Sequence, residues 1–252
     1  MKLGAQLYTV RHKTKTPEDF AETLARVAEI GYTSVQVSAT CAYEPEWLAE
    51  QLKINGLVCP VTHFNAERIA DDGGAVALEH RVYDCGIVGL GSAPGIWLRT
   101  FSYEKFRDKY LPAALNIRGA GAMLGYHNHS PEFRKSGGTT ILERIAEDFP
   151  ADALSFIFDT YWAQFAGHNP AEWIRRLAGR VHCVHLKDLK KTLFRKRMAV
   201  VGEGMIDFDA VISACEASGT QYLLVEQDNC YGEEPFDCLT RSYRNLRAMG
   251  LE

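Results

Sequence analysis

Short apolar segments alternate with longer amphipathic segments along the whole chain, and this alternation restricts the fold more than any other feature. Eight of the short segments have the length, apolar content and β-branched residues typical of strands. The predicted strands are Leu3 to Tyr8, Ser34 to Ser38, Val58 to His63, Gly86 to Leu90, Met123 to His129, Leu154 to Asp159, Val181 to Lys187 and Tyr222 to Gln227. Such a rhythm is typical of repeated β-α units around a parallel sheet.

Helices are predicted in the segments between the strands. The first shows the signals clearly: Thr16 can cap the helix, Pro17 occupies its first position, and Gly31 follows its last turn. The predicted helices are Pro17 to Ile30, Glu46 to Lys53, Ala66 to His80, Tyr103 to Ala120, Thr140 to Asp148, Pro170 to Leu177, Phe208 to Ala217 and Phe236 to Met249.

Eight β-α units in 252 residues predict a single-domain (β/α)8 TIM barrel spanning residues 1–252. No linker or shift in composition divides the chain, and its 46% hydrophobic content is sufficient for a large core. A doubly wound open sheet is the alternative. It is disfavoured because Thr9-Val10-Arg11-His12 follows the first strand, where a dinucleotide-binding fold has a glycine-rich turn.

Charge and composition exclude several classes of function. The formal net charge of −4 provides no basic field for nucleic acid, so we expect no nucleic-acid partner. No apolar run approaches the length of a membrane span, and we expect a soluble, cytoplasmic protein with no membrane partner. The 7 cysteines include no Cys-x-x-Cys pair, which fits neither a disulfide framework nor a zinc ribbon. Whether the chain forms a homo-oligomer stays open.

Polar side chains gather where the predicted strands end. In a barrel these positions form the active-site face, and the carboxylates and imidazoles there would repel one another or lack partners without a cation or substrate. A mixed set of His, Asp and Glu suits Mn²⁺, Zn²⁺, Co²⁺ or Fe²⁺ better than Mg²⁺ or Ca²⁺, so we expect one divalent metal ion. The strand-end residues are Gln6, Tyr8, Gln36, Ser38, His63, His127, His129, Asp159, His185, Lys187, Glu226 and Asp228.

Several motifs resemble those of the xylose isomerase-like barrels, a superfamily of sugar isomerases, ketose 3-epimerases, inosose dehydratase, dehydroshikimate dehydratase and endonuclease IV. The resemblance runs almost end to end and implies a metal-dependent (β/α)8 barrel. The motifs are GAQLYTVR (4–11), GYHNHSPEF (125–133), FDTYW (158–162), VHLKD (184–188), GEGMIDF (202–208) and VEQD (225–228).

The resemblance also implies a set of metal ligands. In that superfamily one metal ion is held at the ends of strands five to eight, usually by Glu, Asp, His and Glu. Matching these positions gives Asp159, His185 and Glu226 for strands six to eight. His127 occupies the strand-five position, where the family usually has Glu, and Glu132 in the same loop is the alternative fourth ligand.

The chemistry shared by the superfamily assigns further roles. A metal ion that chelates a carbonyl and a neighbouring hydroxyl stabilises an enediolate, so proton-transfer groups are needed beside it. The candidates for proton transfer are Glu226, His129, Glu132 and Lys187. The candidates for substrate binding are Gln6, His63, Trp162 and Glu203.

These roles predict a sugar or keto-sugar isomerase/epimerase acting on a small-molecule substrate. A metal-dependent lyase or dehydratase of the inosose dehydratase type is the alternative, and a non-catalytic sugar-binding barrel is less favoured. The absence of Glu at position 127 argues against a two-carboxylate epimerisation mechanism. The basic segment 187–197 is predicted to be a charged surface loop, with a phosphate or carboxylate subsite as the alternative.

Overall fold

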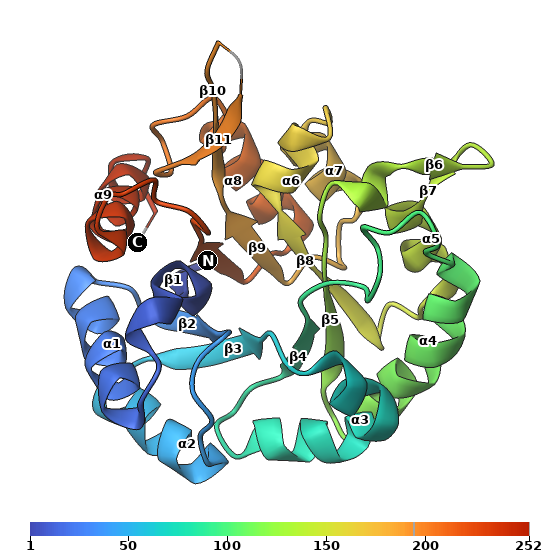
Figure 1. Cartoon of the computed structure of the whole chain (residues 1–252), viewed down its shortest axis with the longest axis horizontal. Coiled ribbons are helices and arrows are strands. Elements are labelled where there is room, and N and C mark those ends of the chain that lie inside the picture. The colour runs from blue at the N-terminus through green and yellow to red at the C-terminus, as the bar shows by residue number, and fades with distance from the viewer. Residues whose placement is uncertain (194, 252) are drawn as a thin grey trace.

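Eight parallel strands close into a barrel in the computed structural model, which describes residues 1–193 and 195–251 (Figure 1). Around the barrel the strand order is β1-β12-β9-β8-β5-β4-β3-β2. The strands are β1 (Lys2–Gln6), β2 (Ser34–Val37), β3 (Val58–Thr62), β4 (Ile87–Leu90), β5 (Met123–His127), β8 (Leu154–Asp159), β9 (Cys183–Leu186) and β12 (Tyr222–Val225). The predicted (β/α)8 TIM barrel is therefore confirmed.

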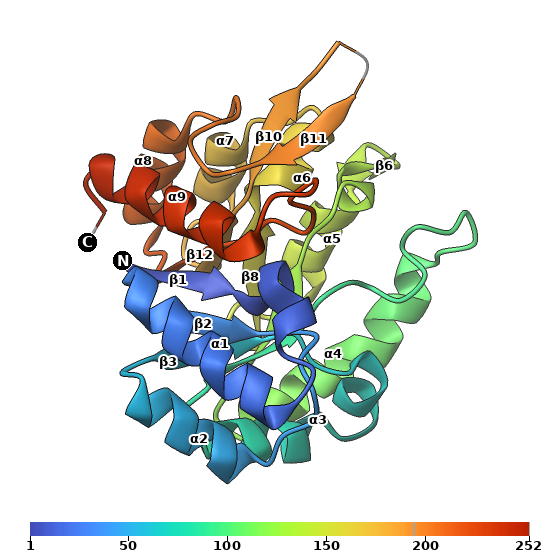
Figure 2. The same cartoon turned by 60° about the vertical axis from the view of Figure 1, so that its left-hand side comes forward.

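Helices surround the barrel as an outer ring (Figures 1 and 2). Each of the predicted helices is present, and an additional short helix, α6, directly follows β8. The helices are α1 (Pro17–Ile30), α2 (Pro45–Ile54), α3 (Ala66–Arg81), α4 (Tyr103–Gly119), α5 (Ile141–Asp148), α6 (Thr160–Phe165), α7 (Pro170–Arg176), α8 (Phe208–Ser218) and α9 (Pro235–Ala248). None of the described helices is long and apolar enough to cross a membrane.

The capping residues predicted for α1 form the expected hydrogen bonds. The Thr16 hydroxyl accepts a hydrogen bond from the Asp19 amide, and Gly31 ends α1 in the left-handed region with φ of 116°. In α5, Thr140 and Glu143 form a capping box. These local bonds satisfy backbone groups that the helices themselves leave unpaired.

The first strand ends two residues earlier than predicted. The Gln6 side-chain oxygen accepts a hydrogen bond from the Tyr8 amide at 2.8 Å, and this turns the chain into a 3₁₀ helix, η1 (Leu7–Lys13). Tyr8 therefore lies in a helical turn at the barrel mouth and not in the strand.

Two hairpins extend beyond the ring of helices (Figure 1). One pairs β6 (Lys135–Ser136) with β7 (Thr139–Thr140), and the other pairs β10 (Asp188–Lys191) with β11 (Lys196–Ala199). The second hairpin occupies the basic segment, whose described residues 190–193 and 195–197 are exposed, so the predicted charged surface loop contains two short strands that the sequence did not indicate; Phe194 lies outside the described residues. The buried Asp188 carboxylate accepts hydrogen bonds from the amides of Leu189, Gly202, Gly204 and Ile206, and these bonds fasten the base of the hairpin to the following loop.

An apolar layer fills the barrel interior. It consists of Val61, Ile87, Ile157, Cys183 and Leu224, each from a different strand. Barrel strands alternate inward and outward positions, so polar side chains at the strand ends lie above this packed layer and share the open end of the barrel.

Candidate active site

Four buried side chains converge at the carboxyl ends of neighbouring strands. They are His127 on β5, Asp159 on β8, His185 on β9 and Glu226 directly after β12. Each offers one nitrogen or oxygen atom, and these atoms all lie within 4.8 Å of one another. Because β5, β8, β9 and β12 are consecutive in the barrel, residues remote in sequence form a single group.

Fixed acceptors determine which ring nitrogen of each histidine faces the group. His127 Nδ1 lies 2.9 Å from the Gly91 carbonyl oxygen, to which only an N–H can donate, so Nε2 faces Asp159 at 3.3 Å. His185 Nε2 lies 2.6 Å from the Gln36 side-chain oxygen, so Nδ1 faces Glu226 Oε2 at 3.0 Å without forming a hydrogen bond. Burial lowers the pKa of His127, but the Asp159 carboxylate outweighs burial and raises this pKa above its usual value, so a bound cation would replace a proton on His127 Nε2. His185 Nδ1 presents a lone pair towards Glu226, an arrangement that a cation stabilises.

The carboxylate of Asp159 is also oriented by its surroundings. One oxygen accepts a hydrogen bond from the Trp162 amide at 2.9 Å and caps α6, while the other faces His127. Burial raises the pKa of Asp159, but the Lys187 ammonium and His127 outweigh burial and hold it below its usual value. Two nitrogens and two carboxylates therefore form a donor set that fits a divalent ion such as Zn²⁺ or Mn²⁺.

Lys187 is buried among three carboxylates. Its Nζ lies 3.2 Å from Glu226, 3.5 Å from Asp159 and 2.6 Å from Asp228. Burial lowers the pKa of Lys187, but these carboxylates raise it above its usual value, so the side chain is an ammonium ion. Lys187 is therefore suited to donate hydrogen bonds to a substrate oxygen and not to remove a proton.

A cavity of about 240 Å³ opens above the metal-binding group. Its aromatic wall includes Trp97, whose ring centroid lies 5.6 Å from that of His129 and 5.7 Å from that of Trp162. The lining residues are Tyr8, Ser38, His63, Gly91, Ser92, Trp97, His127, His129, Lys187, Glu226 and Asp228.

His63 reaches this cavity, whereas Gln6 lies behind it. The Gln6 amide nitrogen is 3.4 Å from His63 Nδ1, so Nδ1 accepts and Nε2 carries the proton. Burial, followed by His127 and His185, holds the pKa of His63 well below its usual value, and the ring is neutral. Its buried Nε2 has no partner among the described residues. Gln6 is fully buried and positions His63, so the predicted direct substrate contact by Gln6 has no geometric support.

Glu132 and His129 occupy different places in the loop after β5. The two Glu132 oxygens accept hydrogen bonds from the Tyr126 hydroxyl at 2.9 Å and the His129 amide at 3.1 Å. Glu132 lies outside the four-residue group, so His127 and not Glu132 is its fourth member, and Glu132 is also absent from the cavity lining where a proton-transfer residue is expected. His129 lines the cavity, and burial lowers its pKa to about 3, so its imidazole is neutral.

Glu203 lies away from the cavity. Its carboxylate pairs with Arg241 at 2.8 Å, and 41% of its side chain is exposed. The loop around it is held by the amides that bind Asp188, which leaves the side chain directed to the surface. The expectation that Glu203 lines a substrate pocket is therefore corrected.

Two contributors were missed in the sequence because their signals are weak. The carbonyl oxygen of Gly91 fixes the ring of His127. Every residue has a backbone carbonyl, so the residue type gives no indication of this role. Trp97 lies in the long loop after β4, a strand that ends without a polar side chain. Only its position after a strand end, on the active-site face of a barrel, could have indicated a role.

Comparisons with known proteins agree with this architecture. Inosose dehydratase from Geobacillus kaustophilus is 25% identical over 147 residues, which are 50% of this chain and 46% of the relative. The chain thus matches about half of the length of that relative. A sugar phosphate isomerase/epimerase from Parabacteroides distasonis superposes with a TM-score of 0.80 at 21% identity, covering 98% of this chain and 94% of the other. The IOLI protein, whose structure contains a zinc atom, gives a TM-score of 0.73 at 13% identity over 99% and 98% of the two chains.

The match to a protein family extends over most of the barrel. Residues 24–241 match the family described as the xylose isomerase-like TIM barrel, and this range includes all four members of the metal-binding group. The chain therefore belongs to the xylose isomerase-like TIM barrel family.

Proposed function

We propose that the protein is a divalent-metal-dependent enzyme that moves a proton next to the carbonyl of a small keto-sugar, as an isomerase or epimerase. The observation that carries this proposal is the convergence of His127, Asp159, His185 and Glu226, with His127 Nε2 and His185 Nδ1 turned towards the carboxylates. Mn²⁺, Zn²⁺, Co²⁺ or Fe²⁺ fits these donors better than Mg²⁺ or Ca²⁺. The zinc-containing structural neighbour supports the same assignment.

The bound metal ion would polarise a substrate carbonyl and lower the pKa of the adjacent C–H group. Glu226 is the carboxylate that lines the cavity among the four donors, and we assign it the removal of that proton. Its pKa is held well below the usual value because Lys187 and His185 outweigh burial, so Glu226 is ionised at neutral pH. Lys187 and the His63 Nε2–H are placed to donate to substrate oxygens.

Unpaired polar atoms around the cavity favour a substrate rich in hydroxyl groups. Among the described lining residues, His63 Nε2 and His129 Nδ1 are buried without a hydrogen-bond partner. A buried polar group without a partner carries a free-energy penalty of about 1–3 kcal/mol. Sugar hydroxyls would satisfy these atoms, while Trp97, which packs against Trp162, would cover the apolar C–H face of the ring.

A dehydratase is the second candidate, and His127 favours it. An epimerase that uses two carboxylates needs a proton-transfer group on each face of the substrate, and His127 replaces the acid expected at the end of β5. Dehydration needs one base and one acid that protonates the departing hydroxyl, and Glu226 with Lys187 provides such a pair at 3.2 Å. The inosose dehydratase relatives support this candidate.

Product analysis in D₂O tests the proposal and separates the two candidates. The metal-loaded protein is incubated with a panel of 2-keto and 3-keto sugars, and products are followed by NMR. An isomer or epimer carrying deuterium at the carbon next to the carbonyl supports the first candidate, and an unsaturated product supports the second. Binding without deuterium exchange or turnover would identify a sugar-binding barrel, and an absence of bound metal would refute the metal centre.

A further inference from the structure

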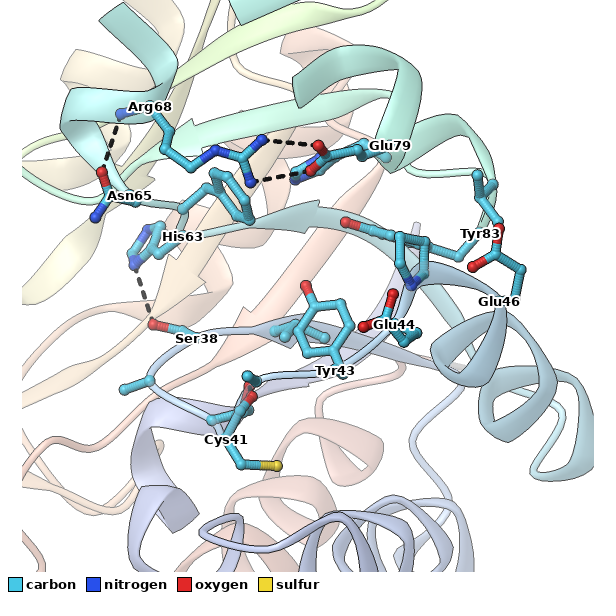
Figure 3. Close-up of a pocket in the computed structure, with 18 of the residues that line it drawn as sticks. Ser38, Cys41, Tyr43, Glu44, Glu46, His63, Asn65, Arg68, Glu79 and Tyr83 are labelled. Carbon is cyan, nitrogen blue, oxygen red and sulfur yellow. Dashed lines mark hydrogen bonds and ion pairs between the residues drawn. The ribbon is translucent and has the colours of Figure 1, made fainter. Parts of the chain in front are cut away.

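A second, larger hollow lies directly beside the cavity above the metal-binding group. This groove has a volume of about 1030 Å³ and runs between the loop 38–46 and α3 (Figure 3). The loop 38–46 connects β2 to α2, so the groove leads from the barrel mouth outwards between α2 and α3.

Ser38 and His63 line both hollows, so the groove begins where the cavity ends. The Ser38 hydroxyl lies 3.5 Å from His63 Nδ1, and Figure 3 shows this pair at one end of the groove. Binding sites for small molecules usually have volumes of about 300–1,000 Å³. The 240 Å³ cavity alone is below that range, which indicates that it holds only the reacting part of a larger substrate.

The walls of the groove suit the face of a ring. Tyr43 and Tyr83 lie with ring centroids 6.3 Å apart, and Figure 3 shows both on the groove lining. On α3, Leu78 is 57% exposed on the same lining. Tyrosine and leucine side chains bind the C–H face of a sugar or an aromatic ring by removing apolar surface from water.

The charges of the groove disfavour an anionic group. The guanidinium of Arg68 binds Glu79 through two hydrogen bonds of 3.2 and 2.7 Å, which neutralises the one cation of the described lining. Glu44 and Glu46 form no ion pair within the described part of the chain. A phosphate or carboxylate in the groove would therefore face uncompensated negative charge.

We infer that the groove is a substrate subsite for an uncharged ring, so that the natural substrate is a keto-sugar carrying a ring substituent and not a sugar phosphate. This inference rests on the proposed function of the adjoining metal centre. The substituent is a second sugar or an aromatic ring attached outside the reacting carbons. It lies between the loop 38–46 and α3 while the keto-sugar occupies the cavity.

Calorimetric titration of the metal-loaded protein tests the subsite independently of turnover. The probes are 3-keto-glucose, its 6-phosphate, its phenyl glycoside and its glucosyl glycoside. We expect at least one glycoside to bind about tenfold more tightly than the free sugar, since ring burial of this kind contributes about 1.4 kcal/mol, and we expect the phosphate to bind no better than the free sugar. Tighter binding of the phosphate, or equal binding of the free sugar and both glycosides, would overturn the inference.

Matched variants locate the effect. Ala42 is exposed on the groove lining, and Ala42→Trp should fill the groove and remove the tenfold preference while leaving the affinity for free 3-keto-glucose unchanged. Leu78→Trp blocks the opposite wall and provides a second variant if the first does not fold. Ala248→Trp, on an exposed position of α9 outside the groove, is the control and should keep the preference.

If either folded groove variant retains the preference, the substituent lies elsewhere and the subsite is refuted. Turnover is measured in parallel on the same four compounds. Glycoside binding without any turnover would refute the proposed enzymatic function but leave the subsite intact. Turnover of all sugars alike, with no effect of Ala42→Trp or Leu78→Trp, would refute the subsite but support the enzyme.

Discussion

At the scale of single residues, the orientation of two imidazole rings gives the site its chemistry. Gln36 comes from β2, on the opposite side of the barrel from β8 and β9, and its side-chain oxygen directs the lone pair of His185 inwards. A residue on β2 thus fixes the orientation of a metal ligand on β9. Gln36 therefore acts on the metal site through the orientation of His185 and not through contact with a substrate.

Replacement of Gln36 should therefore weaken metal binding. We expect Gln36→Leu to lower the affinity for Zn²⁺ or Mn²⁺ about 10- to 100-fold, because the His185 Nε2–H loses its acceptor and the ring loses its orientation. Gln36→Glu retains an acceptor oxygen and should bind metal as tightly as the wild type or more so. Metal titration followed by calorimetry checks both variants, and equal affinity for Gln36→Leu and the wild type would contradict the role.

The two carboxylates of the group should separate binding from catalysis. Asp159→Asn should reduce metal content strongly, because one amide atom replaces a charged donor that is fully buried. Glu226→Gln should lower the rate of turnover by about a thousandfold or more. The variant should still bind part of the metal through the three remaining donors. Metal content by mass spectrometry and initial rates are measured on both. Full activity in either variant would show that these residues are structural.

At the scale of elements, close approach between strands depends on glycine. A Cβ atom on Gly89 of β4 would lie 1.9 Å from the Thr62 carbonyl oxygen of β3, a separation that no side chain can accommodate. We expect Gly89→Ala to destabilise the barrel by about 3 kcal/mol, since the strands must shift. Gly86→Ala is the control because nothing lies within 4 Å of its added Cβ. Urea unfolding of both variants checks the difference, and equal stabilities would contradict the packing.

The connection between β3 and α3 should make stability depend on pH. His80 is fully buried, with Nδ1 2.7 Å from the Val76 carbonyl and Nε2 2.8 Å from the Thr62 hydroxyl. Burial lowers its pKa to about 4 in the folded state. Below the unfolded pKa of about 6.5 the unfolded chain binds the additional proton, so stability falls as the pH decreases from about 6.5 towards 4.

This linkage should contribute about 2 kcal/mol of lost stability between pH 7 and pH 5. In His80→Gln the loss over that interval should be smaller than in the wild type by about this amount, as measured by urea unfolding at both pH values. His12→Gln, at an exposed position, is the matched control and should show the wild-type dependence. An unchanged dependence in His80→Gln would show that other groups account for the acid sensitivity.

Sequence patterns predict the elements well where local forces determine them. The segment Pro17–Ile30 carries its own cap, first-position proline and terminating glycine, and its bounds agree with the structure. The hairpin of β10 and β11 was missed, because its charged strands lack an apolar alternation and its base is held by Asp188, a contact that depends on the folded loop. The positions of Asp159, His185 and Glu226 at strand ends similarly predicted that these residues lie together. The positions of Glu203 and Glu132 could not be predicted in this way, because they depend on the folded partners that bind their carboxylates.

At the scale of the whole molecule, the metal-binding group joins a continuous half of the barrel. Its four donors lie on or directly after β5, β8, β9 and β12, which are neighbours in the sheet, and without a metal ion the Lys187 ammonium opposes the charge of the two carboxylates. A metal ion bound to the native state and not to the unfolded chain stabilises the whole fold by mass action. The strength of the site is therefore measurable as the stability of the barrel.

Metal addition should raise the midpoint of thermal unfolding. At a free concentration a thousand times the dissociation constant, stabilisation is about 4 kcal/mol, which corresponds to roughly 10 °C for a chain of this length. We expect Zn²⁺ or Mn²⁺ to produce this shift in the chelator-treated wild type, as measured by scanning calorimetry, and to produce little shift in the double variant Asp159→Asn with His185→Ala. Mg²⁺ should have a smaller effect because two of the four donors are imidazoles. An equal shift in the wild type and the double variant would place the metal elsewhere on the protein.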